Sequence, residues 1–306
     1  MSSVSHSSFF KSRLPQLSLI LITLIWGGSF LTVKYGLNFS SPVLFVALRF
    51  AAAAIAVTAI SFRHLRGMTL KEVLSGAAIG AVIALGYGTQ TVGLQSISSS
   101  ESAFLTALYV PLVPILLWLL FRKRPHLMTW AGALLAFLGL VFLTGNGFDS
   151  IRLNFGQLLT LLGSIAIAME IILISHFAPN VNTRRVTVFQ LIFASLFCFL
   201  LAPLVGEHQL PNFHWHLAGI LVGLGIASAC IQLVMNWAQE MVDPSQAAII
   251  YAGEPIWASL FGRLAGERLS TLALLGGLMV VLGVIVSEWK PKFLNRKVEK
   301  IKEIPE

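Results

Sequence analysis

Long apolar runs constrain this chain more than any other feature of its sequence. A helix needs about 20 mostly apolar residues to cross the hydrocarbon core of a bilayer, and ten runs of that kind occupy most of the 306 residues. The sequence therefore predicts an all-α membrane protein with ten transmembrane helices. The predicted helices span residues 14–37, 42–62, 73–95, 101–121, 127–144, 153–177, 186–204, 216–239, 245–263 and 269–288.

Composition supports the membrane interpretation, because 56% apolar residues, 11% charged residues and a mean hydropathy of +0.83 lie outside the range of soluble domains. The connecting segments are too short to fold as soluble domains. Two terminal segments remain, a cytoplasmic N-terminal segment of residues 1–13 and a basic cytoplasmic tail of residues 289–306. The tail is expected to be solvated or to lie on the membrane surface.

A cleavable signal peptide is the alternative interpretation of the N-terminus, since Lys11 and Arg13 precede the first apolar run. That run is too long for the apolar part of a signal peptide and does not end in a small-x-small cleavage site. The first helix is therefore expected to remain in the membrane. Cys198 and Cys230 both fall within apolar runs, so we expect small buried hydrophobic side chains and not a disulfide or metal pair.

The distribution of lysine and arginine predicts the orientation of the chain. With ten spans and a cytoplasmic N-terminus, sixteen of these cations lie in inner segments and three in outer segments. This bias predicts that both termini are cytoplasmic in a multi-pass protein of the cytoplasmic (inner) membrane. The net charge of +8 is then explained by the orientation in the membrane. The chain lacks the clustered basic and aromatic residues of a nucleic-acid-binding site, so no nucleic-acid partner is expected.

A tandem duplication relates the two halves of the chain. Shifted by 144 residues, "SAFLTALYVPLVPILLWLLFRKRP" aligns without a gap with "QAAIIYAGEPIWASLFGRLAGERL". The aligned pairs include Pro111 and Pro255, Gly132 and Gly276, Leu134 and Leu278, and Gly139 and Gly283. The sequence thus predicts two five-helix repeats, residues 14–144 and 153–288. Because five is odd, the second repeat enters the membrane from the opposite side, which gives the inverted repeat of many transporters.

Pro111 and Pro255 occupy equivalent places inside the predicted fourth and ninth helices. At about 1.5 Å per residue, each lies roughly 15 Å from the start of its helix, near the membrane midplane. Proline removes a backbone donor, and in lipid that defect is tolerated only where protein or water satisfies the freed groups. A packing bend is one interpretation, but the symmetric placement favours hinges beside a central cavity.

The second half ends in "EPIWASLFGRLAGERLSTLALLGGLMVVLGVIV", which resembles the closing signature of the drug/metabolite transporter superfamily in its ten-helix EamA-like branch. The early "LIWGGSFLTVKYGL" and "ALRF" resemble the first half of the same branch. The resemblance covers essentially the whole chain. It implies a ten-helix inverted repeat around a central cavity, and the transport of small metabolites or drugs, often outward. The fourth helix departs from its twin, so the glutamate of the Gly-Glu-Arg turn occurs once, as Glu267.

Ionisable residues within spans are candidate functional residues, because placing them in a membrane is costly. Glu254, directly before Pro255, is expected to bind a cationic amine or to take up a proton, and Glu170 is the second candidate for the same role. Arg49 is the candidate for holding a substrate carboxylate. For each of the three the alternative is a structural pair within the protein, and for Arg49 an interfacial anchor is a further alternative. Lys34 lies nearer the edge of its span and is the weakest candidate.

Polar and aromatic residues within spans supply the rest of a predicted wet, amphipathic pocket. Each taken alone is more often helix–helix packing than ligand contact. The cavity-lining candidates are Trp26, Tyr87, Gln90, Ser102, Thr106, Tyr109, Gln232, Asn236 and Tyr251.

Enzyme motifs are missing from the sequence, which has no nucleophile elbow, P-loop or dinucleotide fingerprint. The outer histidines His208, His214 and His216 are an alternative metal site, but their spacing matches no known one. We therefore expect no cofactor, no metal and no enzymatic activity. The sequence predicts a secondary transporter, an exporter of small amphiphilic metabolites such as amino acids, acting as a monomer or homodimer. A non-transporting membrane sensor or assembly protein, or a lipid flippase, is the alternative.

Overall fold

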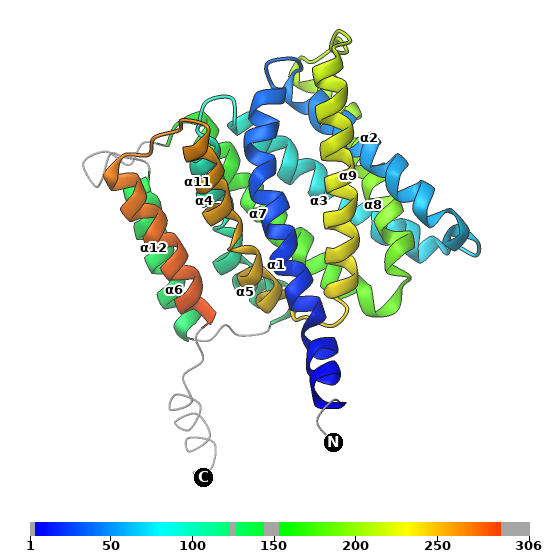
Figure 1. Ribbon diagram of the computed structural model, residues 1–306, viewed down its shortest axis with the longest axis horizontal. Coiled ribbons are helices and arrows are strands. Elements are labelled where there is room, and N and C mark those ends of the chain that lie inside the picture. Colours follow the sequence, from blue (N-terminus) through cyan, green and yellow to red (C-terminus); the bar gives the residue numbers. More distant parts are fainter. Residues whose placement is uncertain (1–3, 123–126, 144–152, 289–306) are drawn as a thin grey trace.

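The computed structural model describes residues 4–122, 127–143 and 153–288, and within these ranges every regular element is a helix (Figure 1). The α-helices are α1 (Val4–Gly36), α2 (Pro42–Ser61), α3 (Leu70–Gly93), α4 (Ser99–Thr106), α5 (Tyr109–Phe121), α6 (Leu127–Leu143), α7 (Phe155–Phe177), α8 (Thr183–Leu201), α9 (Trp215–Ala238), α10 (Pro244–Tyr251), α11 (Glu254–Leu264) and α12 (Thr271–Glu288). Three short 3₁₀ helices are η1 (Phe62–Leu65), η2 (Ala178–Asn180) and η3 (Ala202–Val205).

Seven helical segments of the described chain are long and apolar enough to cross a membrane, and they correspond to the first four and to the sixth, seventh and eighth predicted runs. Two further apolar helices, α6 and α12, are shorter. The ninth run is divided into α10 and α11. The first helix begins at Val4, ten residues before the predicted start at residue 14. The start of α1 and the end of α12 lie on the same side of the bundle (Figure 1).

The bundle has apolar side chains on its outer surface and many polar side chains inside. Ile55 and Leu21 are 72% and 65% exposed, whereas Gln190 and Glu170 are fully buried. Such a distribution suits a lipid environment, in which polar groups must be satisfied within the protein. The prediction that both cysteines are buried is wrong for Cys230, which is exposed on α9. An apolar residue in a spanning helix can face lipid as well as protein, so an apolar run does not reveal which side is buried.

Helices α6 and α12 lie side by side at one edge of the bundle (Figure 1). A Cβ added at Gly139 would lie 2.7 Å from the Gly276 carbonyl oxygen, and one added at Gly283 would lie 2.7 Å from the Gly132 carbonyl oxygen. The end of each helix therefore packs on the start of the other, so the pair is antiparallel. Because Gly132 and Gly139 align with Gly276 and Gly283 in the duplication, the contact has twofold character. These glycines therefore allow the close approach of the two helices.

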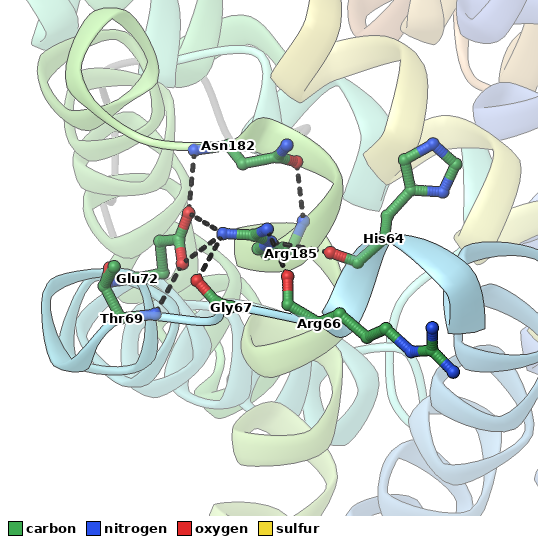
Figure 2. A network of polar contacts seen from close by, with 7 residues as sticks. All are labelled: His64, Arg66, Gly67, Thr69, Glu72, Asn182 and Arg185. Atoms are coloured by element: carbon green, nitrogen blue, oxygen red, sulfur yellow. Dashed lines mark hydrogen bonds and ion pairs between the residues drawn. The ribbon is translucent and has the colours of Figure 1, made fainter.

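A network around Arg185 joins the starts of α3 and α8 (Figure 2). The Arg185 guanidinium donates to both carboxylate oxygens of Glu72 at 3.2 Å and to the carbonyls of His64, Arg66 and Gly67. Glu72 also accepts from the Asn182 backbone and completes a capping box with Thr69 at the start of α3. One buried carboxylate and one guanidinium thus fix the loop between α2 and α3 against the second half of the chain.

Candidate functional site

Two helix breaks place the central residues of the bundle. Helix α4 ends at Thr106 and α5 begins at Tyr109, while α10 ends at Tyr251 and α11 begins at Glu254. The predicted hinge prolines Pro111 and Pro255 lie in the first turn of the helix that follows each break. Proline is tolerated there, because first-turn N–H groups have no partner within the helix. In place of the predicted kinks the structure has two-residue turns, residues 107–108 and 252–253, which occur at equivalent places in the two halves.

Helix α1 packs closely against the break between α10 and α11. A Cβ at Gly27 would lie 2.8 Å from the Glu254 carbonyl oxygen and 2.6 Å from the Cβ of Trp257. Only glycine permits this approach without a shift of the helices. The neighbouring residue on α1, Trp26, is thereby brought to the centre, where it is 1% exposed.

A row of aromatic rings crosses the centre of the bundle. The ring of Tyr87 stacks on Trp26 with centroids 6.2 Å apart, and the ring of Tyr251 meets Trp26 edge-on at 5.8 Å. At the far end of the row, the Arg49 guanidinium lies 5.5 Å from the centroid of Tyr87 and 5.6 Å from that of Phe50. The row therefore connects a buried cation on α2 with the helix break that precedes Glu254.

Glu254 is fully buried, and neither of its carboxylate oxygens has a hydrogen-bond partner among the described residues. The Tyr109 side chain faces the carboxyl, but its hydroxyl does not meet the geometry of a hydrogen bond and has no other described partner. An unpartnered carboxyl away from water is costly. Structural pairing, the alternative for Glu254, has no support in these contacts.

Glu170 on α7 ends a chain of buried amides. Its Oε1 accepts from Gln232 Nε2 at 2.7 Å, Gln232 Oε1 accepts from Gln190 Nε2 at 2.6 Å, and Gln190 Oε1 accepts from Asn236 Nδ2 at 3.1 Å. The other carboxylate oxygen, Oε2, has no described partner. Glu170 is thus fully buried in the bundle, and its carboxylate is held by an amide and not by an arginine or lysine. Gln190, which joins the chain, was not predicted.

A second unpredicted amide, Gln239, follows the end of α9. Its Nε2 donates to the Tyr251 hydroxyl at 2.8 Å, and its Oε1 accepts from the Ser175 hydroxyl at 2.9 Å. Tyr251 is therefore positioned both by the ring of Trp26 and by this amide. Gln239 was not among the predicted cavity residues, because the sequence does not reveal that this side chain at the end of α9 is buried.

Arg49 is 3% exposed and donates from Nε to the Ser228 hydroxyl at 2.8 Å. The ion pairs of the described chain join Lys34 to Glu267 and Arg185 to Glu72, so Arg49 has no carboxylate partner among the described residues. Of the alternatives, the interfacial anchor is therefore wrong, because the guanidinium is held within the bundle. The guanidinium is therefore held by the Ser228 hydroxyl and by the rings of Phe50 and Tyr87.

Residues of the interrupted fourth helix line the same centre. Thr106 accepts a hydrogen bond from Gln90 Nε2 at 2.9 Å, and both are buried. Ser102 is fully buried, and its hydroxyl has no partner in the described part of the chain.

Apart from Lys34, every predicted site residue is buried in the bundle. The contacts above form three groups: the aromatic row with Arg49, the amide chain of Glu170, and the pair of Gln90 and Thr106. Electrostatic interactions of Tyr87 with Arg49, Glu170 and Glu254 place these residues near one another, and we name the three groups and Glu254 together the central cluster.

Glu267 closes the end of the bundle opposite the start of α1, which the cation bias predicts to be outer. Its carboxylate accepts four hydrogen bonds, from the backbone N–H and the hydroxyl of both Ser99 and Ser100, at 2.9 to 3.2 Å. Lys34 Nζ lies 3.9 Å from the carboxylate and donates to the Ile97 carbonyl at 2.6 Å. We name Lys34, Ser99, Ser100 and Glu267 the outer latch. Lys34 is thus an anchored contact and not a freely snorkelling side chain.

The charge of Glu267 is stabilised in this arrangement. Burial by itself raises the pKa of the carboxyl, but the hydrogen bonds from Ser99 and Ser100 together outweigh it, so the pKa lies below the ordinary glutamate value. Beside the latch is a cavity of about 510 Å³ whose lining includes Leu31, Lys34, Gln95 and Glu267. Two residues of the latch, Lys34 and Glu267, therefore form part of the wall of this cavity.

The outer histidines form no evident metal site. His214 and His216 pack around the ring of Phe39, with centroids 5.8 and 6.2 Å away. In the part of the chain that the structure describes, no group of three or more His, Cys, Asp and Glu side chains is placed to hold a metal ion.

Comparison with known proteins identifies the two halves. The model of the EamA-like transporter family matches residues 14–145 and 154–289. An uncharacterized transporter of Archaeoglobus fulgidus is 31% identical over 90% of this chain and 86% of its own length. The uncharacterized inner membrane transporter YedA of Escherichia coli K12 is 27% identical over 90% of this chain and 92% of its own. A solved crystal structure shares the fold at 19% identity, with a TM-score of 0.66 over 94% of this chain and 99% of that one.

Proposed function

Because the chain belongs to the EamA-like transporter family, it is a membrane transporter, and we propose that it is a secondary transporter that exports small amphiphilic metabolites, such as amino acids, by alternating access. It is a multi-pass protein of the inner membrane, in keeping with the name of its relative YedA. The proposal depends most on one observation, the fully buried Glu254 carboxyl without a hydrogen-bond partner at a helix break.

The central cluster matches the chemistry of a zwitterion with an apolar body. Glu254 and the free oxygen of Glu170 suit an ammonium group, and aromatic faces add attraction for a cation. Arg49, at the other end of the aromatic row, suits a carboxylate. Trp26, between Tyr87 and Tyr251, suits the apolar part. The same carboxyls could instead take up a proton, which would couple export to a gradient.

Ten spans in two inverted repeats remain part of the proposal. In this count, α4 and α5 together form one interrupted span, and α10 and α11 form another. The shorter helices α6 and α12 are counted as one span each. At 1.5 Å per residue, the 17 and 18 residues of α6 and α12 extend about 26 to 27 Å, close to the thickness of the hydrocarbon core. The twofold contact of their glycines supports inversion of one repeat relative to the other.

Transport by the purified protein in liposomes tests the proposal. Uptake of labelled amino acids and cationic drugs is measured with and without a pH gradient, for the parent and for Glu254→Gln. The matched control is Glu240→Gln, because Glu240 is exposed and outside the central cluster. We expect Glu254→Gln to lose transport while it remains folded and the control to transport normally. Full transport by Glu254→Gln would remove this residue from the mechanism.

A lipid flippase is the second candidate, favoured by a groove of about 610 Å³ between α2, α3, α7 and α8. Apolar side chains such as Leu85, Val92 and Leu159 line much of it, and Gly88 opens onto free space. Glu207 at its rim is already bonded to the backbone N–H groups of Val43 and Leu44. Movement of fluorescent lipid between leaflets of the same liposomes, unaffected by Glu254→Gln, would favour this candidate.

A further inference from the structure

The inner ends of α2, α8 and α9 enclose a groove of about 380 Å³ that is separate from the central cluster. Apolar and polar residues share its wall. The lining includes Ile60 and Ser61 of α2, Arg184 of α8, and Leu233, Val234 and Trp237 of α9.

Arg184 brings an unneutralised charge to this groove. Its Nη1 lies 3.1 Å from His64 Nε2, and it forms no ion pair with a described carboxylate. Its neighbour Arg185 differs, because Glu72 and three carbonyls enclose that guanidinium (Figure 2). Of two consecutive arginines, one therefore stabilises the fold, and the other lines the groove with a charge that no described carboxylate neutralises.

The surroundings of Arg184 are cationic. Arg63, His64 and Arg66 are exposed in the adjoining loop, and in Figure 2 the His64 ring and the Arg66 guanidinium point away from Arg185. The Glu72 carboxylate is already bonded to Arg185. Glu240, three residues after Trp237, is exposed but not within ion-pair distance of Arg184. An anion from outside the chain would therefore meet a net positive site.

The apolar part of the groove identifies the kind of anion. Ile60 is 67% exposed and Trp237 is 37% exposed, at the end of the bundle where positive residues predict the inner membrane surface. Basic pockets between helices at this level bind anionic lipid headgroups. A soluble anion would leave Ile60 and Trp237 uncovered, whereas a lipid tail would cover them.

From this charge and shape we propose that the groove binds one anionic phospholipid of the inner leaflet. Arg184 and His64 bind the phosphate, and the tail lies along Ile60, Leu233 and Val234. The Trp237 ring borders the headgroup region, where tryptophan is enriched in membrane proteins. The site is independent of the transported substrate and does not depend on the proposed function.

Thermal unfolding of the delipidated full-length protein in detergent tests this site. Phosphatidylglycerol, phosphatidylcholine and inorganic phosphate are titrated separately, since a ligand of the folded state raises the midpoint according to its affinity. We expect phosphatidylglycerol alone to raise the midpoint strongly and Arg184→Gln to weaken its apparent affinity about five- to tenfold. The matched control, Lys71→Gln, removes an exposed cation of the same membrane face that does not line the groove.

Three results would overturn the proposal: full phosphatidylglycerol affinity in Arg184→Gln, an equal loss in Lys71→Gln, or an equal shift with phosphatidylcholine or phosphate. If Arg184→Gln lowers the thermal midpoint already in phosphatidylcholine, the binding site is tested instead by the quenching of tryptophan fluorescence with brominated phosphatidylglycerol. Brominated phosphatidylglycerol should quench the fluorescence more than brominated phosphatidylcholine does. Replacement of Trp237 by Phe should remove this difference. Unchanged selective quenching in that variant would place the lipid elsewhere.

Discussion

Replacement of Glu267 by alanine should open the outer end of the bundle. The carboxylate accepts four hydrogen bonds from Ser99 and Ser100, at the start of α4. Hydrogen bonds to a charged group contribute about 1.5–3 kcal/mol each and are not additive, and loss of a helix N-cap costs about 1 kcal/mol. Because the two serine hydroxyls can turn to water, we expect a net loss of about 2 kcal/mol in the closed arrangement. The open population then rises about 30-fold.

Cysteine labelling measures this opening. Ser102 lies on the same short helix as Ser99 and Ser100, is fully buried, and has a hydroxyl without a described partner. Ser102→Cys, combined with Cys230→Ser, therefore provides a reporter beneath the latch. A membrane-impermeant maleimide added from outside should label it about 30-fold faster when Glu267 is alanine, provided that closing is faster than labelling.

Two controls distinguish a local opening from general loosening. Cys198, buried in α8, reports global unfolding in the same molecules, so its labelling should not change. Glu240→Ala removes an exposed carboxylate outside the latch and should leave the rate at Ser102→Cys unaltered. The reasoning is refuted if Glu267→Ala labels at the parent rate, or if Cys198 reacts faster in parallel.

Three further predictions follow from the same contacts. Since the Glu267 pKa is lowered in the folded protein, the stabilisation by the latch is present above the ordinary glutamate pKa of about 4.3 and is lost only as pH falls through the lower folded value. Because the thiolate is the species that reacts with maleimide, the rate itself falls with pH, but the ratio of the Ser102→Cys labelling rates with and without Glu267→Ala should be constant from pH 8 to 5; a fall of this ratio near pH 6 would contradict the assignment. Gly139→Ala should lower the free energy of unfolding by about 1–3 kcal/mol, because its Cβ would lie 2.7 Å from Gly276, whereas Gly219→Ala, with no atom within 4 Å, should cost nothing in denaturant titrations; equal effects would argue against the close packing. Glu254→Leu should raise the thermal midpoint while abolishing transport, because it removes a buried carboxyl without a partner, and a lowered midpoint would indicate a structural pair.

The sequence predicts the membrane elements well, because apolar length and proline position act locally. The helix breaks near Pro111 and Pro255, and the glycines that align in the duplication, follow directly from such signals. Side-chain pairing is different. A spanning helix is mostly apolar on every side, so its sequence does not reveal whether Cys230 is exposed or whether Gln190 faces Gln232. Those outcomes depend on the rotation and register of neighbouring helices.

The contacts of the outer latch could not be predicted either, because they join residues that are far apart in the sequence. Glu267 is recognisable in the sequence as part of a turn that occurs only once, but its acceptor role depends on Ser99 and Ser100, 168 and 167 residues away. Lys34 is also distant from its partners, the Ile97 carbonyl and Glu267. No local pattern joins these three segments, and only the packing of α1, α4 and α11 does so.

The unequal ends of the two repeats bear on the transport cycle. Shifted by 144 residues, Glu267 aligns with Lys123 and Ser99 with Asp243. A lysine cannot accept hydrogen bonds from helix N–H groups, and the start of α10 is capped instead by its own Asp243, which accepts from the Ser245 backbone at 3.0 Å. A fully symmetric duplication would give the two closed arrangements equal free energy. Among the described residues, a carboxylate from the second half binds the start of α4 at the outer end, and no carboxylate from the first half binds the start of α10. In the proposed cycle we therefore expect the resting protein to favour a closed outer end and an inner end that opens first.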